Sequence, residues 1–152
     1  MNVDAFDQRM HAGYINQHEN DLDSAYFCFD EALKLANSEQ ERTEASVCMA
    51  TTLVMEGDFQ SALDLLLSIK ATECISIITI NHLIANCHHS LHQFEEAKIA
   101  YLTAISASSH LPPGNWISDQ IATNYLHLLD DEKRVTSLPR AIVDVTPTQQ
   151  CA

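Results

Sequence analysis

The chain has 152 residues, of which 46% are hydrophobic, 21 are acidic and eight are Lys or Arg, giving a formal net charge of −13. This balance argues against nucleic acid and anionic membranes as partners, because both are bound through clustered Lys and Arg that neutralise phosphate. The length fits one compact domain, and three glycines and four prolines are too few for the frequent turns of a β-sandwich, so we expect an all-α protein.

Three segments of the chain share one register, and each predicts a pair of helices. In the second helix of each pair, a central alanine follows one large apolar residue by three positions and precedes another by four, which places all three on one helical stripe. The central alanines are Ala25, Ala62 and Ala97. Twelve residues before each alanine is a small residue, at which two helices can approach closely. The small residues are Gly13, Ala50 and Ala85.

The predicted helices span about residues 5–18, 22–36, 39–56, 59–70, 73–91 and 94–107, in pairs over about 6–36, 39–70 and 73–107. Ser38 with Glu41 forms a capping-box pattern before the second pair, and side-chain N-caps are expected at Asn20, Asp58 and Thr72. The run CISIITI has the β-branched residues of a strand. An isolated strand between helices would have no partner, so we predict a helix there.

A break at SSHLPPGN precedes a last helix over about residues 116–131, which has apolar residues at helical spacing and no partner helix after it. The last repeat of a solenoid exposes an apolar face, so an end helix that covers this face is expected. We therefore predict a repeat domain over residues 1–134 and a flexible tail over residues 135–152, which lacks a clear period.

The central alanines are 37 and 35 residues apart, close to the 34-residue tetratricopeptide period. The phrases EGDFQSALDLLLSI and LHQFEEAKIAYLTAI resemble the turn and second helix of the tetratricopeptide repeat family, over about residues 6 to 129. The turn glycine is present only as Gly57, with Asn20 and His92 at the other turns. The resemblance implies an α-solenoid of three helix pairs plus a C-terminal capping helix. Size, acidity and architecture also resemble those of the small tetratricopeptide chaperones of bacterial type III secretion.

In such a solenoid the first helices line a concave face, which implies a groove for a partner. The positions expected to line this groove are Met10, His11, Tyr14, Glu44, Val47, Cys48, Thr51, Met55, Thr79, His82, Leu83, Asn86, His89, Gln120 and Thr123. They mix apolar and polar side chains and include no Lys or Arg, which favours a protein partner in the form of an amphipathic helix or an extended apolar peptide. The alternative for Met10, Val47 and Met55 is that they only fill the core.

A second candidate site is the sequence Cys87-His88-His89 with His92. His88 and His92 are four residues apart, so on a helix they share a face and suit a transition metal. No HExxH motif or second cysteine pair accompanies them, and packing and capping explain the same residues, so no metal or other cofactor is expected.

Catalysis is not expected either. The chain contains no glycine-rich phosphate loop or nucleophile elbow, and its cysteines lack adjacent Lys or Arg clusters that would lower a thiol pKa. The sequence thus predicts a non-enzymatic adaptor or dedicated chaperone. The alternatives are a structural or self-assembling subunit, including a homodimer, and a metal-binding protein that uses the Cys87, His88, His89 and His92 cluster. Five cysteines without CxxC spacing, no run resembling a secretory signal and no membrane-length apolar run favour a cytoplasmic location.

Overall fold

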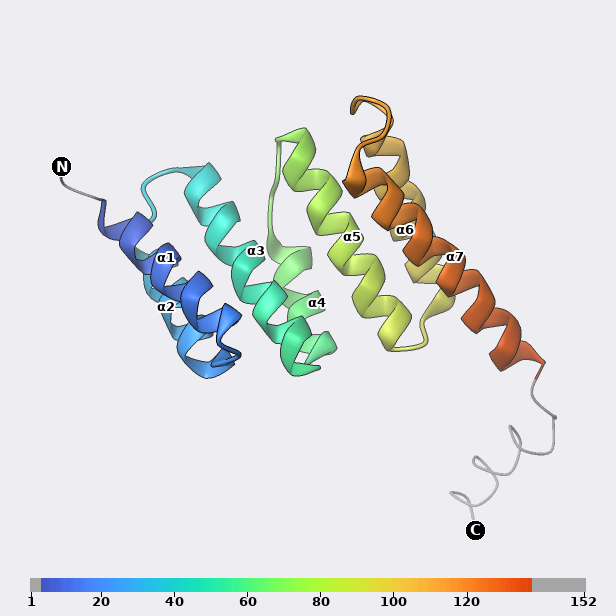
Figure 1. Cartoon of the computed structure of the whole chain (residues 1–152), viewed down its shortest axis with the longest axis horizontal. Coiled ribbons are helices and arrows are strands. Elements are labelled where there is room, and N and C mark those ends of the chain that lie inside the picture. The colour runs from blue at the N-terminus through green and yellow to red at the C-terminus, as the bar shows by residue number, and fades with distance from the viewer. Residues whose placement is uncertain (1–3, 138–152) are drawn as a thin grey trace, which may run out of the picture.

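The computed structural model describes residues 4–137 and contains seven α-helices and no strand over that range. The helices are α1 (Ala5–His18), α2 (Leu22–Leu35), α3 (Glu39–Glu56), α4 (Phe59–Ser68), α5 (Cys74–Ser90), α6 (Phe94–Ser108) and α7 (Trp116–Thr136). Each helix packs against the next one along the chain. Further contacts join α3 to α5 and α5 to α7. Helices α1, α3, α5 and α7 therefore form one layer and α2, α4 and α6 form a second layer behind it (Figure 1). The predicted all-α solenoid is confirmed.

Close approach within each pair depends on the small residues that the sequence singled out. The central alanines Ala25, Ala62 and Ala97 are fully buried. Gly13 of α1 lies against the ring of Phe29 in α2, and a Cβ atom at this position would be 2.4 Å from Phe29 Cε1. The absence of a side chain at Gly13 is therefore what allows the first two helices to pack around a buried aromatic ring.

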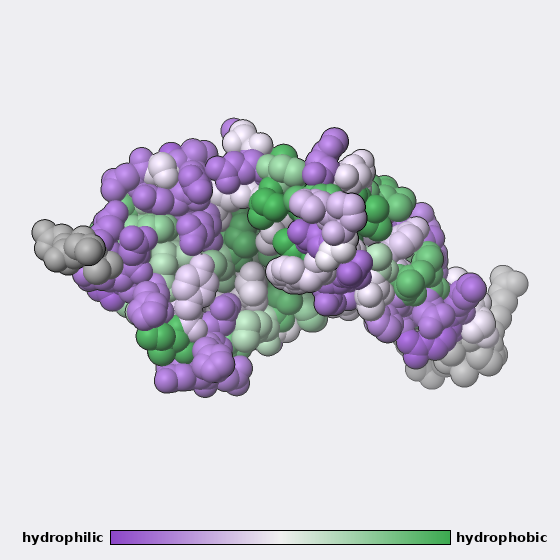
Figure 2. Space-filling view, turned by 45° about the horizontal axis from the view of Figure 1, so that its top comes forward, coloured by the Kyte–Doolittle hydropathy of each residue, from purple (hydrophilic) through white to green (hydrophobic). Residues whose placement is uncertain are grey.

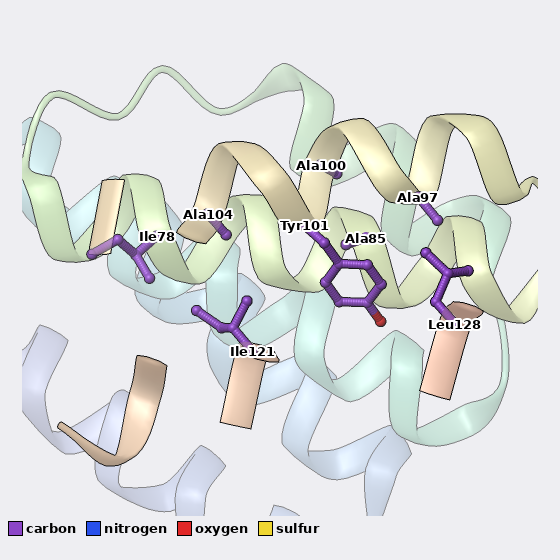
Figure 3. Packing of buried hydrophobic residues seen from close by; sticks show 8 residues of the cluster. All are labelled: Ile78, Ala85, Ala97, Ala100, Tyr101, Ala104, Ile121 and Leu128. Atoms are coloured by element: carbon purple, nitrogen blue, oxygen red, sulfur yellow. The ribbon is translucent and has the colours of Figure 1, made fainter. Parts of the chain in front are cut away.

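The hydrophobic core is continuous because each first helix also packs on the pair before it. Ala45 and Met49 of α3 complete the core of the first pair. Ile80 and Cys87 of α5 complete that of the second pair. The third pair is completed by α7, which places Ile121 and Leu128 on either side of the Tyr101 ring, as Figure 3 shows. These shared cores are how a solenoid of short hairpins buries enough apolar surface to be stable.

The turns between paired helices show why two of them lack glycine. Gly57 adopts the left-handed conformation with φ 85°, and Asn20 and His92 occupy the same region at φ 63° and φ 58°. Asparagine and histidine are among the non-glycine residues that tolerate this conformation best. All three turns thus close in the same way without an invariant glycine.

The predicted caps are partly correct. Asp58 and Ser38 accept the expected backbone N–H groups. The prediction for Asn20 is wrong, because its left-handed backbone belongs to the turn and Asp21 caps α2 instead. The prediction for Thr72 is also wrong, because α5 begins one residue later and its N-cap residue, Glu73, makes no side-chain capping bond.

Helix α7 is longer than the sequence predicted, ending at Thr136 rather than near residue 131. Ion pairs support this extra turn: Glu132 pairs with Lys98 of α6 at 2.7 Å, and Asp131 pairs with Arg134. The predicted tail over 135–152 therefore begins too early, and its remainder after residue 137 lies outside the described residues. The run CISIITI is helical, as predicted. None of the helices over residues 4–137 combines the length and the apolar character that crossing a membrane requires.

Candidate partner-binding face

The layer formed by α1, α3, α5 and α7 carries two neighbouring hollows. The first hollow has a volume of about 280 Å³ and lies between α3 and the start of α5, with Tyr14 of α1 at its edge. Its lining residues are Tyr14, Gln40, Thr43, Glu44, Val47, Cys48, Glu73, Ile75, Ser76 and Thr79. Figure 2 shows hydrophobic surface in a recess near the middle of the molecule, beside the hydrophilic surface of the N-terminal helices.

The second hollow, of about 190 Å³, lies between α5 and the start of α7. Its lining residues are Thr51, Thr79, His82, Leu83, Asn86, Trp116, Ile117 and Gln120. Thr79 of α5 lines both hollows, so they adjoin each other across that helix. Together they form a surface that crosses all four helices of the layer, and we refer to it as the inner face.

Tyr14 organises the polar side of the first hollow. Its hydroxyl lies 3.4 Å from Glu44 Oε1 and 3.3 Å from Cys48 Sγ, and its ring packs edge-on against Phe29 at 5.4 Å. Burial raises the pKa of the Tyr14 hydroxyl, and the neighbouring Cys48 and Glu44 raise it further. Burial also raises the pKa of the Cys48 thiol. Both groups are therefore neutral near pH 7, and Cys48 lacks the thiolate character that a nucleophile needs.

Hydrogen bonds between three helices fix the wall of the second hollow. The Tyr101 hydroxyl donates to Asn86 Oδ1 at 2.6 Å, and the Asn124 amide lies 2.8 Å from His82 Nε2 and 3.4 Å from Asn86 Oδ1. Burial lowers the pKa of His82, so its ring is neutral near pH 7 and can accept from Asn124. Through these contacts α6 and α7 hold two groove-lining side chains of α5 in place.

Most of the predicted groove residues come together in the two hollows. Those lining the first are Tyr14, Glu44, Val47, Cys48 and Thr79, and those joining them in the second are Thr51, His82, Leu83, Asn86 and Gln120. His11, Met55 and Thr123 are exposed but line neither hollow. His89 lies at the other end of α5, where Nε2 is 2.6 Å from Asp131 Oδ2 and Nδ1 is 3.4 Å from the Tyr101 hydroxyl.

Met10 does not line the groove. Only 4% of its surface is exposed, and it packs in the core with Phe6 and Phe29. Val47 and His82 occupy the same register position in the next two pairs, and both are half-buried at the edge of a hollow. The unbranched, flexible side chain of methionine can instead fold into the core. The core-filling alternative is therefore correct for Met10.

The structure adds residues at helix ends that the sequence reasoning did not place in the groove. Ile75, in the first turn of α5, is 50% exposed, and Trp116, the first residue of α7, is 74% exposed. Each lines one hollow. The sequence feature that could have indicated them is a large apolar residue in the first turn of a helix that is not required for core packing.

The histidine cluster does not converge on a common point. Cys87 is fully buried in the core, and burial raises the pKa of its thiol to about 11. His88 Nδ1 lies 2.6 Å from Gln93 Oε1, whereas His89 bonds Tyr101 and Asp131. His92 forms the turn. Within residues 4–137 no group of three or more His, Cys, Asp or Glu side chains is arranged to hold a metal ion.

Comparison with known proteins places this architecture in a class. Residues 78–110, which cover most of α5 and all of α6, match the family model described as a tetratricopeptide repeat. This segment is therefore similar to a tetratricopeptide repeat, which agrees with the family resemblance of the sequence, and the helices of residues 4–137 stack as an α-solenoid.

Among solved structures, the crystal structure of PcrH from Pseudomonas aeruginosa is similar, with a TM-score of 0.69 at 13% sequence identity. The match covers 85% of this chain and 95% of PcrH. At this identity the likeness concerns the fold. No curated protein sequence matches the chain significantly.

Proposed function

We propose that this protein is an adaptor or dedicated chaperone that holds a segment of another protein, as an amphipathic helix or an extended apolar peptide, on its inner face. The observation that carries the proposal is the pair of adjoining hollows across α1, α3, α5 and α7. They combine exposed apolar side chains with hydrogen-bonding groups, as peptide-binding grooves do.

The narrower proposal of a type III secretion chaperone rests on size, acidity and architecture. The fold-level likeness to PcrH supports it. A cytoplasmic location is part of the same proposal, and the free thiols of Cys28, Cys48, Cys74 and Cys87 suit a reducing compartment.

The test uses exposed groove residues, so that loss of binding is not loss of folding. Partners captured by the wild-type protein are identified, produced separately and titrated against the variant Ile75→Glu/Trp116→Glu by calorimetry. The control Leu67→Glu/Leu126→Glu adds the same charge at side chains that are 63% and 65% exposed and line neither hollow. We expect affinity to drop at least tenfold in the groove variant only. Equal affinities of the groove variant and the wild type would rule out the inner face as the binding site.

A self-assembling subunit is the second candidate, and one observation favours it. The outward side of α6 carries an open hollow without Asp, Glu, Lys or Arg, lined by Ile99, Leu102, Thr103, Ser106, Ala107 and His110. Exposed apolar patches of this kind are typical of protein contacts. Sedimentation velocity over a concentration series tests this candidate: a dimer that dissociates on dilution and is abolished by Ile99→Glu/Leu102→Glu supports self-assembly, and a monomer throughout rejects it.

A further inference from the structure

The two hollows of the inner face differ in charge. The first hollow carries two carboxylates, Glu44 on α3 and Glu73 at the start of α5. The second hollow is lined by no Asp, Glu, Lys or Arg, and burial lowers the pKa of its one histidine, His82, which keeps that ring neutral. The inner face is therefore acidic at one end and uncharged at the other.

Neither carboxylate of the first hollow forms an ion pair in the described part of the chain, although Lys70 lines an adjoining hollow together with Glu73. Over residues 4–137 the Lys and Arg side chains that form ion pairs use Asp30, Glu31, Glu39, Glu95, Asp131 and Glu132 as partners. Glu44 makes one side-chain hydrogen bond, from Tyr14, and Glu73 makes no capping bond to its own helix. Both carboxylates thus keep lone pairs available beside the apolar surface of Val47 and Ile75.

We propose, on the basis of the binding role proposed above, that the partner segment is cationic and apolar at one end and uncharged and apolar at the other. A large apolar side chain fills the first hollow against Val47 and Ile75, and a neighbouring Lys or Arg pairs with Glu44 and Glu73. An uncharged apolar or aromatic side chain fills the second hollow against Leu83 and Trp116. The charge difference between the hollows fixes the direction in which the segment lies.

The physical reason is electrostatic complementarity combined with burial. The long stem of a Lys or Arg side chain covers apolar surface while its charged head stays at the rim, which suits a hollow that is apolar inside and acidic at its edges. A carboxylate of the partner at the same place would be repelled by both glutamates and by the overall charge of −13. Acidic segments are thereby rejected, and basic apolar segments are selected.

Selection from a random-peptide phage library against the full chain tests this inference. Peptides that bind the wild type and fail to bind Ile75→Glu/Trp116→Glu are collected, and one is synthesised with a fluorescent label together with a version in which each Lys and Arg is replaced by Gln. Fluorescence anisotropy then gives affinities for the variant Glu44→Gln/Glu73→Gln. The matched control Asp23→Asn/Glu96→Gln removes the same charge from exposed first-turn residues of α2 and α6.

We expect the collected peptides to be rich in Lys or Arg next to large apolar residues, and their affinity to fall about three- to tenfold on Glu44→Gln/Glu73→Gln but little on the control. Equal binding of the charged and neutral peptides, or equal losses in the two double variants, overturns the charge selection while leaving the groove intact. If every peptide that binds the wild type binds Ile75→Glu/Trp116→Glu equally well, so that none is collected, the binding role itself fails, and this inference fails with it.

Discussion

Replacing Gly13 with alanine tests the helix packing on which the inner face is built. Gly13 lies within α1 at an ordinary helical position, so an alanine there is favoured by about 1 kcal/mol through helix propensity alone. However, the added Cβ would lie 2.4, 2.7 and 2.8 Å from three carbons of the Phe29 ring. These distances are well below van der Waals contact, so either the ring or the helix has to move.

The cost of this movement exceeds the gain in propensity. Phe29 is fully buried and packs edge-on against Tyr14, so a shift of its ring disturbs the packing of the side chains around it. Overpacking of a tight core typically costs about 1–3 kcal/mol. Because the added Cβ would clash with three atoms of the Phe29 ring, we expect a cost in the upper part of that range. Subtracting about 1 kcal/mol of helix propensity, we expect Gly13→Ala to lower the free energy of unfolding by about 1–2 kcal/mol.

Urea denaturation followed by circular dichroism measures this change. The variant Ala122→Gly is the control, because Ala122 lies inside α7 and is exposed, so only the propensity cost of about 1 kcal/mol applies. In the double variant Gly13→Ala/Phe29→Leu the smaller side chain relieves the clash, and the alanine should cost less there than in the wild-type background. A Gly13→Ala protein as stable as the wild type, or more stable, would refute the close-packing argument.

Three further outcomes follow from capping and pKa values. Asp58→Ala should destabilise the protein by about 1 kcal/mol, because Asp58 caps α4 through Ser61 N–H at 3.1 Å, whereas Thr72→Ala should change stability by less than about 0.5 kcal/mol. Burial lowers the pKa of His82 in the folded protein. As the pH falls below about 6.5, His82 is therefore protonated in the unfolded chain at a higher pH than in the folded protein, which favours unfolding. The urea midpoint of the wild type should therefore fall more between pH 7.5 and 5.5 than that of His82→Gln, with both measured in about 0.1 M salt. The hydrogen bond from His89 is the main cause that lowers the pKa of Asp131, and the contact with Arg134 adds to it. The ionised Asp131 therefore stabilises the fold at neutral pH, and this contribution is lost as the pH falls below about 4. Asp131→Asn should accordingly lower the urea midpoint at pH 7 and have little effect near pH 3.

The repeat could be predicted from sequence because its signal is local and periodic. A central alanine, its flanking apolar residues and a small residue twelve positions earlier recur in three segments, and each of these positions has one structural role. The turn residues Asn20 and His92 are also at the predicted places. Helix ends were less predictable, since they depend on single backbone conformations and on ion pairs such as Lys98 with Glu132, which joins residues distant in sequence.

Only the central residues of the candidate site could be predicted from the sequence. Residues such as Val47, Leu83 and Asn86 follow directly from the repeat register, because the register defines the inward side of each first helix. Ile75 and Trp116 line the hollows because helix starts from different repeats meet there, and no periodic pattern encodes that meeting. Met10 was assigned to the groove because the register predicts the side of the helix on which it lies, but the register does not predict the direction of a flexible side chain.

Helix α7 links the stability of the solenoid to the shape of its inner face. Its residues Ile121 and Leu128 cover Tyr101 and so close the core of the third pair. The same helix begins at Trp116, which forms part of the wall of the second hollow, while Asn124 holds His82 at the base of that wall. Detachment of α7 would therefore expose the Tyr101 core and dismantle the second hollow in a single step. A partner that contacts Trp116 binds only the docked state, so by mass action it must also stabilise the end of the solenoid.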